Sequence, residues 1–218
     1  MKTALIFGSS GLVGGHLLTK LIQNNNYSKI KVFIRSELKI NDSKLDIIKT
    51  DFNNLENHRE DIKGDDCFFC IGTTKKNSPD KNEYRRVELD IPKEIAQIAK
   101  SNSVNSFAFI SSGYADAKSS GDYLKFKGLV EEELKNLNFS KLAIMRPSFL
   151  IGDRKEERVG EKIGIFLFKM LSPLFLGPLK KMKPIQSEIV ARAMIRATNE
   201  NLEKNIFESN EIVELVLN

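Results

Sequence analysis

A set of glycines near the amino terminus constrains the fold of this chain more than any other feature. Gly8, Gly11 and Gly14 follow the apolar run Ala4–Phe7, and the amphipathic stretch Leu12–Asn25 begins inside the same turn. An apolar strand, a glycine turn and a helix in this order form the first part of a strand–helix–strand unit. Glycine is needed where the backbone turns tightly or where another backbone approaches it closely. We therefore expect parallel strands that are connected by helices.

The same alternation continues along the chain. Short apolar segments separated by helical patterns are typical of a parallel sheet that is covered on both faces. We predict strands at Thr3–Phe7, Ile30–Ile34, Leu45–Lys49, Cys67–Ile71, Ser106–Ile110 and Lys141–Met145. The predicted helices are Leu12–Asn25, about Asn54–Ile62, Tyr84–Ser101, Tyr123–Leu137 and Ile185–Thr198. Right-handed crossovers then give an α/β fold, a doubly wound parallel sheet of the Rossmann type, with ligands outside the carboxyl ends of its strands.

The chain of 218 residues is long enough for one domain of this kind. The regular alternation stops near Phe149, so we expect residues 149–218 to form a small cap on the ligand side of the single domain 1–218. The most apolar stretch, residues 163–176, is shorter than the ~20 residues that span a bilayer, so no transmembrane segment is expected. It is open to interpretation as a buried helix, a hydrophobic lid, a self-association face or a membrane-surface contact.

Composition argues against several classes of function. The net charge of +5 comes from scattered Lys and Arg, and Trp is absent, which disfavours a nucleic-acid partner. Cys67 and Cys70 lie three apart in a predicted strand and should face opposite sides, while His16 and His58 lack partners at ligand spacing. No metal site is therefore expected. Because the first strand begins at about Lys2, no targeting peptide is expected either, and a cytoplasmic location is predicted.

The glycine turn predicts a dinucleotide site. Gly8 permits the tight turn, Gly11 lets the backbone approach a pyrophosphate, and Gly14 permits close packing of the helix on the strand. The helix that begins near Leu12 directs free N–H groups and its positive dipole end at the phosphates. A strand–turn–helix without a ligand remains the alternative.

The end of the second predicted strand indicates which dinucleotide is bound. An acidic residue there would bind the adenosine ribose, whereas Arg35 suits a 2′-phosphate and Ser36 adds a hydroxyl. NADP(H) is therefore preferred, and Glu37 keeps NAD(H) possible. Asp51, after the third strand, is expected to face the adenine.

A Ser…Tyr-x-x-x-Lys set is the candidate catalytic group. The Tyr-x-x-x-Lys spacing occurs three times, at Tyr27/Lys31, Tyr114/Lys118 and Tyr123/Lys127. Position favours the third pair, because Tyr123 begins a predicted helix that follows the strand ending at Ser111 and Ser112, so that Tyr123 and Lys127 lie one turn apart. Ser112 is the first choice for the serine and Ser111 the reserve. The alternative is that Tyr123 only packs and Lys127 is solvated.

The residue types suit carbonyl reduction. Hydride transfer to a carbonyl leaves an alkoxide that needs a proton, and a phenol with a pKa of about 10 is too weak an acid unless its anion is stabilised. The Lys127 ammonium would lower the pKa of Tyr123, and a serine hydroxyl would orient the substrate oxygen.

With these motifs placed, the chain resembles the short-chain dehydrogenase/reductase superfamily, and most of all its atypical Tat-interacting protein branch of NAD(P)H-binding proteins. The motifs that carry the resemblance are Gly8–Gly14, Arg35, Cys70–Thr74, Ile110–Ser112, Tyr123–Gly128 and Met145–Pro147 with Gly152–Arg154. The resemblance implies a Rossmann-type fold with NADPH across the strand ends. It assigns the cofactor contacts to Ser10, Gly11, Leu12, Val13, Arg35, Ser36, Ile71, Gly72, Thr73, Lys127, Leu150 and Arg158.

Two segments depart from the common pattern of the superfamily. Ile71–Thr74 replaces Asn-Asn-Ala-Gly, and Arg146–Ser148 replaces Arg-Pro-Gly. The resemblance implies an NADP(H)-dependent oxidoreductase acting on a small, partly apolar carbonyl or alcohol. The alternative is an NADPH-binding regulatory or redox-sensing protein that acts through a protein partner. A homodimer is a separate expectation for the chain. An enzyme like a nucleotide-sugar epimerase is third, because the C-terminal portion is small for holding a nucleotide sugar.

Overall fold

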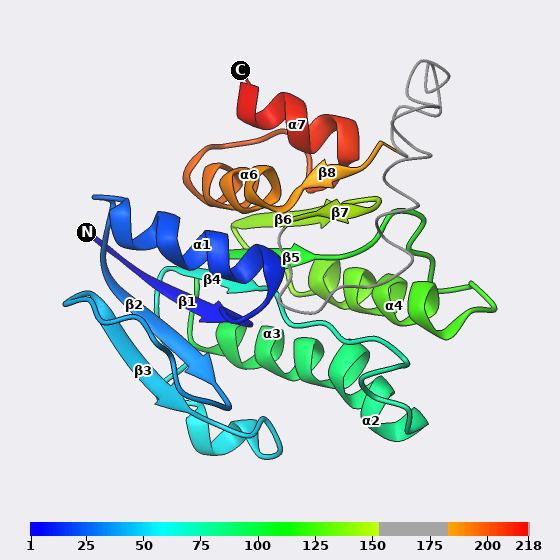
Figure 1. Cartoon of the computed structure of the whole chain (residues 1–218), viewed down its shortest axis with the longest axis horizontal. Helices are drawn as coiled ribbons and strands as arrows, with labels where there is room; N and C mark the ends of the chain where they lie inside the picture. Colours follow the sequence, from blue (N-terminus) through cyan, green and yellow to red (C-terminus); the bar gives the residue numbers. More distant parts are fainter. Residues whose placement is uncertain (153–182, 218) are drawn as a thin grey trace.

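A parallel sheet of seven strands forms the centre of the protein in the computed structural model, which describes residues 1–152 and 183–217 (Figure 1). The strand order is β3-β2-β1-β4-β5-β6-β9, and every neighbouring pair is parallel. The strands are β1 (Lys2–Phe7), β2 (Tyr27–Ile34), β3 (Leu45–Lys49), β4 (Asp66–Phe69), β5 (Ser106–Ile110), β6 (Lys141–Arg146) and β9 (Ile206–Glu208). The order reverses between β1 and β4, where doubly wound sheets bind their ligands. The predicted Rossmann-type fold is confirmed.

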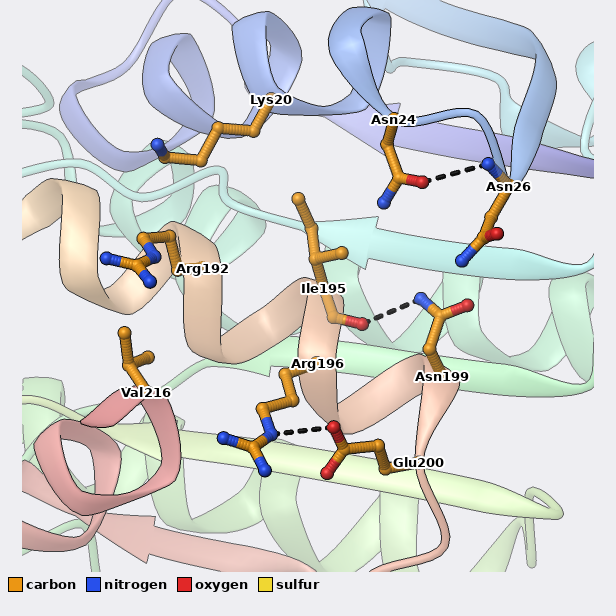
Figure 2. Close-up of a pocket in the computed structure, with 9 residues that line it drawn as sticks. All are labelled: Lys20, Asn24, Asn26, Arg192, Ile195, Arg196, Asn199, Glu200 and Val216. Atoms are coloured by element: carbon orange, nitrogen blue, oxygen red, sulfur yellow. Dashed lines mark hydrogen bonds and ion pairs between the residues drawn. The ribbon is translucent and has the colours of Figure 1, made fainter. Parts of the chain in front are cut away.

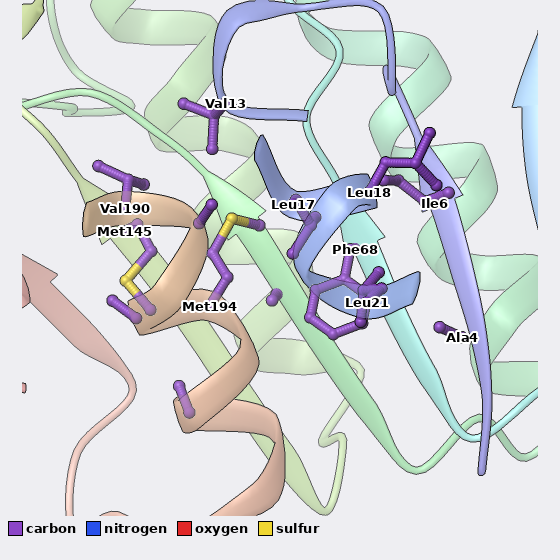
Figure 3. Close-up of a cluster of buried hydrophobic side chains, with 14 of the residues drawn as sticks. Ala4, Ile6, Val13, Leu17, Leu18, Leu21, Phe68, Met145, Val190 and Met194 are labelled. Carbon is purple, nitrogen blue, oxygen red and sulfur yellow. The ribbon is translucent and has the colours of Figure 1, made fainter. Parts of the chain in front are cut away.

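Helices cover both faces of the sheet (Figure 1). One face carries α1 (Leu12–Gln23), α6 (Ser187–Asn199) and α7 (Ser209–Leu217), and the other carries α3 (Ile91–Ser101) and α4 (Asp122–Asn136). The sequence explains this, because alternate residues of the all-apolar β1 point to opposite faces. Ala4 and Ile6 pack with α1 and α6 (Figure 3), whereas Leu5 and Phe7 pack with α3 and α4.

Several element boundaries differ from the predictions. The fourth strand ends at Phe69 rather than Ile71, so that Cys70 and Ile71 begin the following loop. The predicted helix at Asn54–Ile62 is only the 3₁₀ turn η1 (Leu55–His58). As predicted, Cys67 and Cys70 pack on opposite faces of the sheet, and both are free thiols.

The predicted helix Tyr84–Ser101 begins earlier and contains an irregular turn. It starts with α2 (Lys81–Arg85), whose cap Asp80 accepts hydrogen bonds from the backbone N–H groups of Asn82 and Glu83, both at 2.9 Å. A π-helical turn, η2 (Arg86–Asp90), then connects α2 to α3. Such turns insert one extra residue into a helix and are frequent at functional sites.

The C-terminal part of the chain that the structure describes lies in the layers of the main sheet. β9 pairs with β6 as the edge strand, and α6 packs beside α1. Residues 206–208 therefore belong to the main sheet, while the cap expected over residues 149–218 stays a prediction, since residues 153–182 lie outside the described part of the chain. A second sheet consists of two parallel strands, β7 (Leu150–Ile151) and β8 (Ile185–Gln186), which pair the segment after β6 with the segment before α6. The apolar segment 163–176 and Arg158 lie outside the described residues.

Among the helices of residues 1–152 and 183–217, none combines the length and the apolar character that crossing a membrane requires.

Candidate functional site

The glycine turn lies at the carboxyl end of β1, against the loop that follows β4. Gly8 has a φ of 89°, and a Cβ there would lie 2.7 Å from the carbonyl carbon of Cys70. A Cβ on Gly14 would lie 2.0 Å from the carbonyl oxygen of Gly8. Any side chain at these two positions is therefore sterically excluded. Because Gly8 and Gly14 have no side chains, β1, the first turn of α1 and the loop after β4 can lie in close contact.

The start of α1 presents polar groups that suit a phosphate. Gly11 precedes the helix in an extended conformation and provides no side-chain cap. The first N–H groups of such a helix lack intrahelical partners, and the positive end of the helix dipole attracts anions. The Ser9 hydroxyl in the same turn is buried and has no hydrogen-bond partner within the part of the chain that the structure describes. Both features fit the pyrophosphate of a dinucleotide.

The side chains of the turn differ in what they can offer. Ser10 is exposed, whereas Val13 is buried in the core below α1, so that only its backbone can face a ligand. Leu12 is half-buried, and a Cβ on Gly152 would lie 2.7 Å from its Cδ1 atom. Leu150 is half-buried in β7, two residues before Gly152. The β7 segment therefore reaches the same edge of the sheet as the glycine turn.

Arg35 and Ser36 follow β2 and are both exposed. Arg35 makes no ion pair with any residue in 1–152 or 183–217. Its guanidinium is therefore available to a ligand at the next strand end from the glycine turn. Asp51, after β3, is also exposed, and its carboxylate accepts two hydrogen bonds from Asn53, each of 2.9 Å. The backbone N–H of Asn53 is the main reason that the pKa of Asp51 lies below its usual value.

The loop after β4 is tied to the π-helical turn η2. Ile71, Gly72 and Thr73 lie in this loop, next to the glycine turn. The backbone N–H of Thr73 donates to Oε1 of Glu88 at 2.5 Å, and a Cβ on Gly72 would lie 3.5 Å from the same oxygen. The predicted cofactor loop is therefore held in place by a glutamate in η2.

Lys127 lies on the first turns of α4, and its side chain is only 4% exposed. Its Nζ atom is 3.0 Å from Oε2 of Glu88, donates to the carbonyl oxygen of Ile110 at 3.2 Å, and lies 4.9 Å from the centroid of the Phe109 ring. Burial is the largest single influence and opposes the charge, but the Glu88 carboxylate together with Tyr123 and Glu131 outweighs it, so that the pKa of Lys127 lies above its usual value. Lys127 is therefore a charged, buried residue and not a solvated one.

Tyr123 lies one turn before Lys127 on α4 and is 39% exposed. The Lys127 Nζ atom is 6.0 Å from the centroid of the Tyr123 ring. Tyr84 of α2 faces the same region, and burial is the main reason that its pKa is raised. Tyr114 is 53% exposed in a turn after β5, where its φ of 65° is left-handed, so Tyr114 and Lys118 do not share a helix. Geometry thus supports the choice of Tyr123.

Ser111 and Ser112 have different environments at the end of β5. Ser111 is buried, and its hydroxyl donates to Oε1 of Glu131 at 2.5 Å. The hydroxyl of Ser112 is half-buried and reaches only the carbonyl oxygen of the next residue, Gly113, at 3.3 Å. Ser112 is therefore the serine that can turn towards a ligand, while Ser111 belongs to the support of the site.

Glu131 and Arg146 form this support. Arg146, at the end of β6, donates to both oxygens of Glu131 at 2.9 and 2.6 Å and to the Ala115 carbonyl oxygen at 3.1 Å. A further contact of 3.3 Å joins it to Glu208 in β9. The paired carboxylate of Glu131 is the main reason that the pKa of Arg146 is raised. These contacts connect α4, β6, β9 and the loop after β5, next to Ser111.

Sequence reasoning missed Glu88, although a signal for it exists. Tyr84, Glu88, Ile91 and Ile95 follow the spacing of one helix face, and all four are buried. A charged residue on an otherwise apolar helix face requires a buried partner. Only the fold identifies that partner as Lys127, which is 39 positions later in the sequence.

A separate hollow of about 480 Å³ lies at the opposite edge of the sheet, where α1 and α6 end (Figure 2). It contains none of the predicted site residues. Two of its cations already have partners, since Lys20 pairs with Glu188 at 2.7 Å and Arg196 with Glu200 at 2.7 Å. We therefore place the functional site at the glycine turn, where the strand order reverses.

Comparison with known sequences identifies the family of the chain. Residues 8–166 match the profile of a family described as NAD(P)H-binding. The chain belongs to this NAD(P)H-binding family. Protein HTATIP2 of Rattus norvegicus is 33% identical over 164 residues, which cover 73% of this chain and 67% of that protein. Protein FMP52, mitochondrial, of Candida glabrata is 28% identical over 228 positions, covering 100% of this chain and 97% of that protein. These relatives place the chain in the atypical branch of the short-chain dehydrogenases/reductases.

Solved structures share the fold. The enzyme WbmH of Bordetella bronchiseptica, in complex with NAD+, has a TM-score of 0.71 and 16% identity, over 95% of this chain and 74% of that one. A UDP-N-acetylglucosamine 4-epimerase of Methanobrevibacter ruminantium has a TM-score of 0.70 and 17% identity, over 98% of this chain and 80% of that one. At these identities the likeness establishes the Rossmann-type fold alone.

Proposed function

We propose that the chain is an NADP(H)-dependent oxidoreductase that interconverts a small, partly apolar carbonyl compound and its alcohol. The observation that carries this proposal is the position of the Tyr123–Lys127 pair. The Lys127 Nζ atom lies 6.0 Å from the centroid of the Tyr123 ring. It donates a hydrogen bond to the carbonyl oxygen of Ile110, the last residue of β5, at the carboxyl ends of the strands where the glycine turn also lies. Acid–base residues and a dinucleotide turn at one sheet edge are what hydride transfer requires.

Each side chain has a distinct role in the proposed reaction. The bound dinucleotide would supply the hydride. Ser112 Oγ would hold the substrate oxygen in place, and Tyr123 Oη would donate a proton to that oxygen as it becomes an alkoxide. The Lys127 ammonium would stabilise the resulting phenolate. In the oxidation direction the same phenolate would accept the proton of the alcohol.

The cofactor contacts follow from the strand ends. The N–H groups at the start of α1 and the Ser9 hydroxyl would bind the pyrophosphate, and Ile71 to Thr73 would line the adenine-side ribose. Arg35, exposed and without an ion pair among the described residues, supports a 2′-phosphate and hence NADP(H) over NAD(H). Residues 149–152 would border the substrate side through their contact with Leu12.

A titration of the purified chain with NADPH and NADH, followed by cofactor fluorescence, tests the cofactor. We expect the wild type to prefer NADPH. Arg35→Ala should lose about 2 kcal/mol of NADPH binding, the value of a charged hydrogen bond, with little change for NADH. Lys135→Ala, which removes an exposed cation at the far end of α4, is the matched control. Equal losses for both cofactors would remove the 2′-phosphate assignment, and no binding to the wild type would remove the enzyme proposal.

A second candidate is an NADPH-binding regulator that acts through a protein partner or a second copy of the chain. The nearly complete burial of the Lys127 side chain and its ion pair with Glu88 favour it. Tyr123→Phe separates the two functions. In an oxidoreductase this change should lower the turnover of a carbonyl compound by about 10²–10⁴, the usual contribution of a positioned acid or base, and keep NADPH affinity. Tyr114→Phe should leave turnover intact. A nucleotide-sugar epimerase is the third candidate.

The compartment remains a prediction. The sequence favours the cytoplasm, whereas the related FMP52 proteins are named as mitochondrial. Fractionation of cells that express the chain would decide between the two.

A further inference from the structure

Glu88 is a buried carboxylate that joins three segments of the proposed site. It lies in the π-helical turn η2 and is 1% exposed. One oxygen accepts the Thr73 N–H at 2.5 Å, and the other lies 3.0 Å from the Lys127 ammonium. Glu88 therefore connects the cofactor loop after β4 with the helix that carries Tyr123.

The Glu88 carboxylate has one charged partner, Lys127, among the described residues. Its Oε2 atom accepts no well-directed hydrogen bond within the described ranges, so that the ion pair with Lys127 is its main compensation. An unpaired carboxylate or ammonium in such a position is strongly disfavoured, because each has lost its hydration. Each of the two charges is thus required for the other to remain buried.

The Lys127 ammonium is not fully used by these contacts. It has three N–H donors, and the described residues engage two, at Glu88 and at the Ile110 carbonyl oxygen. The third is available for a hydroxyl of a cofactor or for the Tyr123 phenolate. The groups that act on Lys127 from the packed elements are Glu88 of η2, Phe109 of β5, Cys70 after β4, and Tyr123 and Glu131 of α4.

We propose that Glu88 is the positioning residue of this site: its carboxylate keeps the Lys127 ammonium charged and fixed, and holds the Thr73 peptide of the cofactor loop against it. The inference rests on the proposed function, because it takes Lys127 as a cofactor-side cation. Its consequence is that occupation of the Ile71–Thr73 loop and the charge on Lys127 are linked through one side chain. Glutamine in place of Glu88 retains the size and the acceptor for Thr73 but removes the compensating charge.

The test is the pH dependence of NADPH affinity in the wild type and in Glu88→Gln. The wild type should bind equally well between about pH 7 and pH 9, because Lys127 stays charged below its raised pKa. In Glu88→Gln the pKa of Lys127 falls, so affinity should decrease about tenfold as pH rises through this range and should recover on return to pH 7. Glu94→Gln, which weakens a part-buried pair with Arg86, is the control and should follow the wild type.

The outcomes separate the two proposals. If the wild type does not bind NADPH, the proposed function fails. The inference fails if the wild type binds NADPH and the affinity of Glu88→Gln is the same as that of the wild type at every pH. It also fails if that affinity is lower by one constant factor at every pH, because Glu88 then does not control Lys127. If Glu88→Gln folds too poorly for a binding measurement, the melting temperatures of the single and double variants test the inference instead. Glu88→Gln/Lys127→Met should melt higher than Glu88→Gln alone, because it removes the orphaned ammonium, and a lower value would contradict the inference.

Discussion

At the scale of single residues, neighbours with the same chemistry have separate tasks. Ser111 and Ser112 are adjacent serines at the end of β5, and the sequence alone leaves both as candidates. The fold commits Ser111 to Glu131 and leaves Ser112 half-buried at the sheet edge. Hydroxyl groups one position apart differ because alternate residues at a strand end face opposite directions.

Alanine at each of these serines should therefore have a different effect. Ser111→Ala leaves a buried oxygen of Glu131 without its hydroxyl donor and should lower the free energy of unfolding by about 1–3 kcal/mol. Ser112→Ala should change that free energy by less than about 0.5 kcal/mol and should instead lower carbonyl turnover. Urea denaturation of the two variants measures the first effect. Equal destabilisation by both would contradict the division of roles.

At the scale of elements, the start of α1 depends on contacts that only a missing side chain allows. Gly14 and Gly15 are consecutive glycines inside the helix, and helix propensity treats them alike. Their surroundings differ, since a Cβ on Gly14 would lie 2.0 Å from the Gly8 carbonyl oxygen, whereas a Cβ on Gly15 would lie 3.7 Å from the Ser9 carbonyl oxygen. The first is a clash with backbone and the second is an ordinary contact.

This pair provides a matched test of the glycine turn. Gly14→Ala should destabilise the protein by about 1–3 kcal/mol through overpacking and should abolish cofactor binding by displacing the turn. Gly15→Ala should stabilise it by about 0.5–1 kcal/mol, because alanine is the better helix former, with binding retained. Thermal unfolding with and without NADPH measures both quantities. Binding by Gly14→Ala equal to that of the wild type would exclude the turn as the phosphate site.

At the scale of the whole molecule, a buried polar cluster lies at the amino ends of the central strands, opposite the proposed site at their carboxyl ends. Asp66 of β4 is fully buried and accepts hydrogen bonds from Tyr27 at 2.7 Å, Lys2 at 2.9 Å and Ser106 at 2.5 Å. Tyr27 also lies 3.4 Å from the Thr198 hydroxyl at the end of α6. The cluster therefore ties the first two strands to the C-terminal helix layer.

The cluster should make the fold sensitive to alkali. Burial, followed by the charge of Asp66, raises the pKa of Tyr27 well above its usual value. A group whose folded pKa is raised contributes its full stability below its unfolded pKa of about 10 and loses it as the pH rises further. Tyr27→Phe should cost about 1–2 kcal/mol at neutral pH, and the difference from the wild type should shrink above about pH 10.

Urea denaturation at several pH values measures this difference. Glu132→Gln, at an exposed position of α4, is the control and should match the wild type throughout. If the difference in the free energy of unfolding between Tyr27→Phe and the wild type stays constant through the alkaline range, ionisation of Tyr27 does not contribute to the loss of stability.

The sequence by itself determined the first six strands of the sheet, the glycine turn and the Tyr123–Lys127 helix. These features are local, because strand and helix periodicity, glycine sterics and a spacing of four residues act over one element. It did not determine the end of the fourth strand, the pairing of β9 with β6, or the π turn, since these depend on neighbours distant in the chain. Only the tertiary structure made Glu88 the partner of Lys127 and Glu131 the partner of Ser111. The reason is that a buried charge requires compensation, and the fold decides which distant residue provides it.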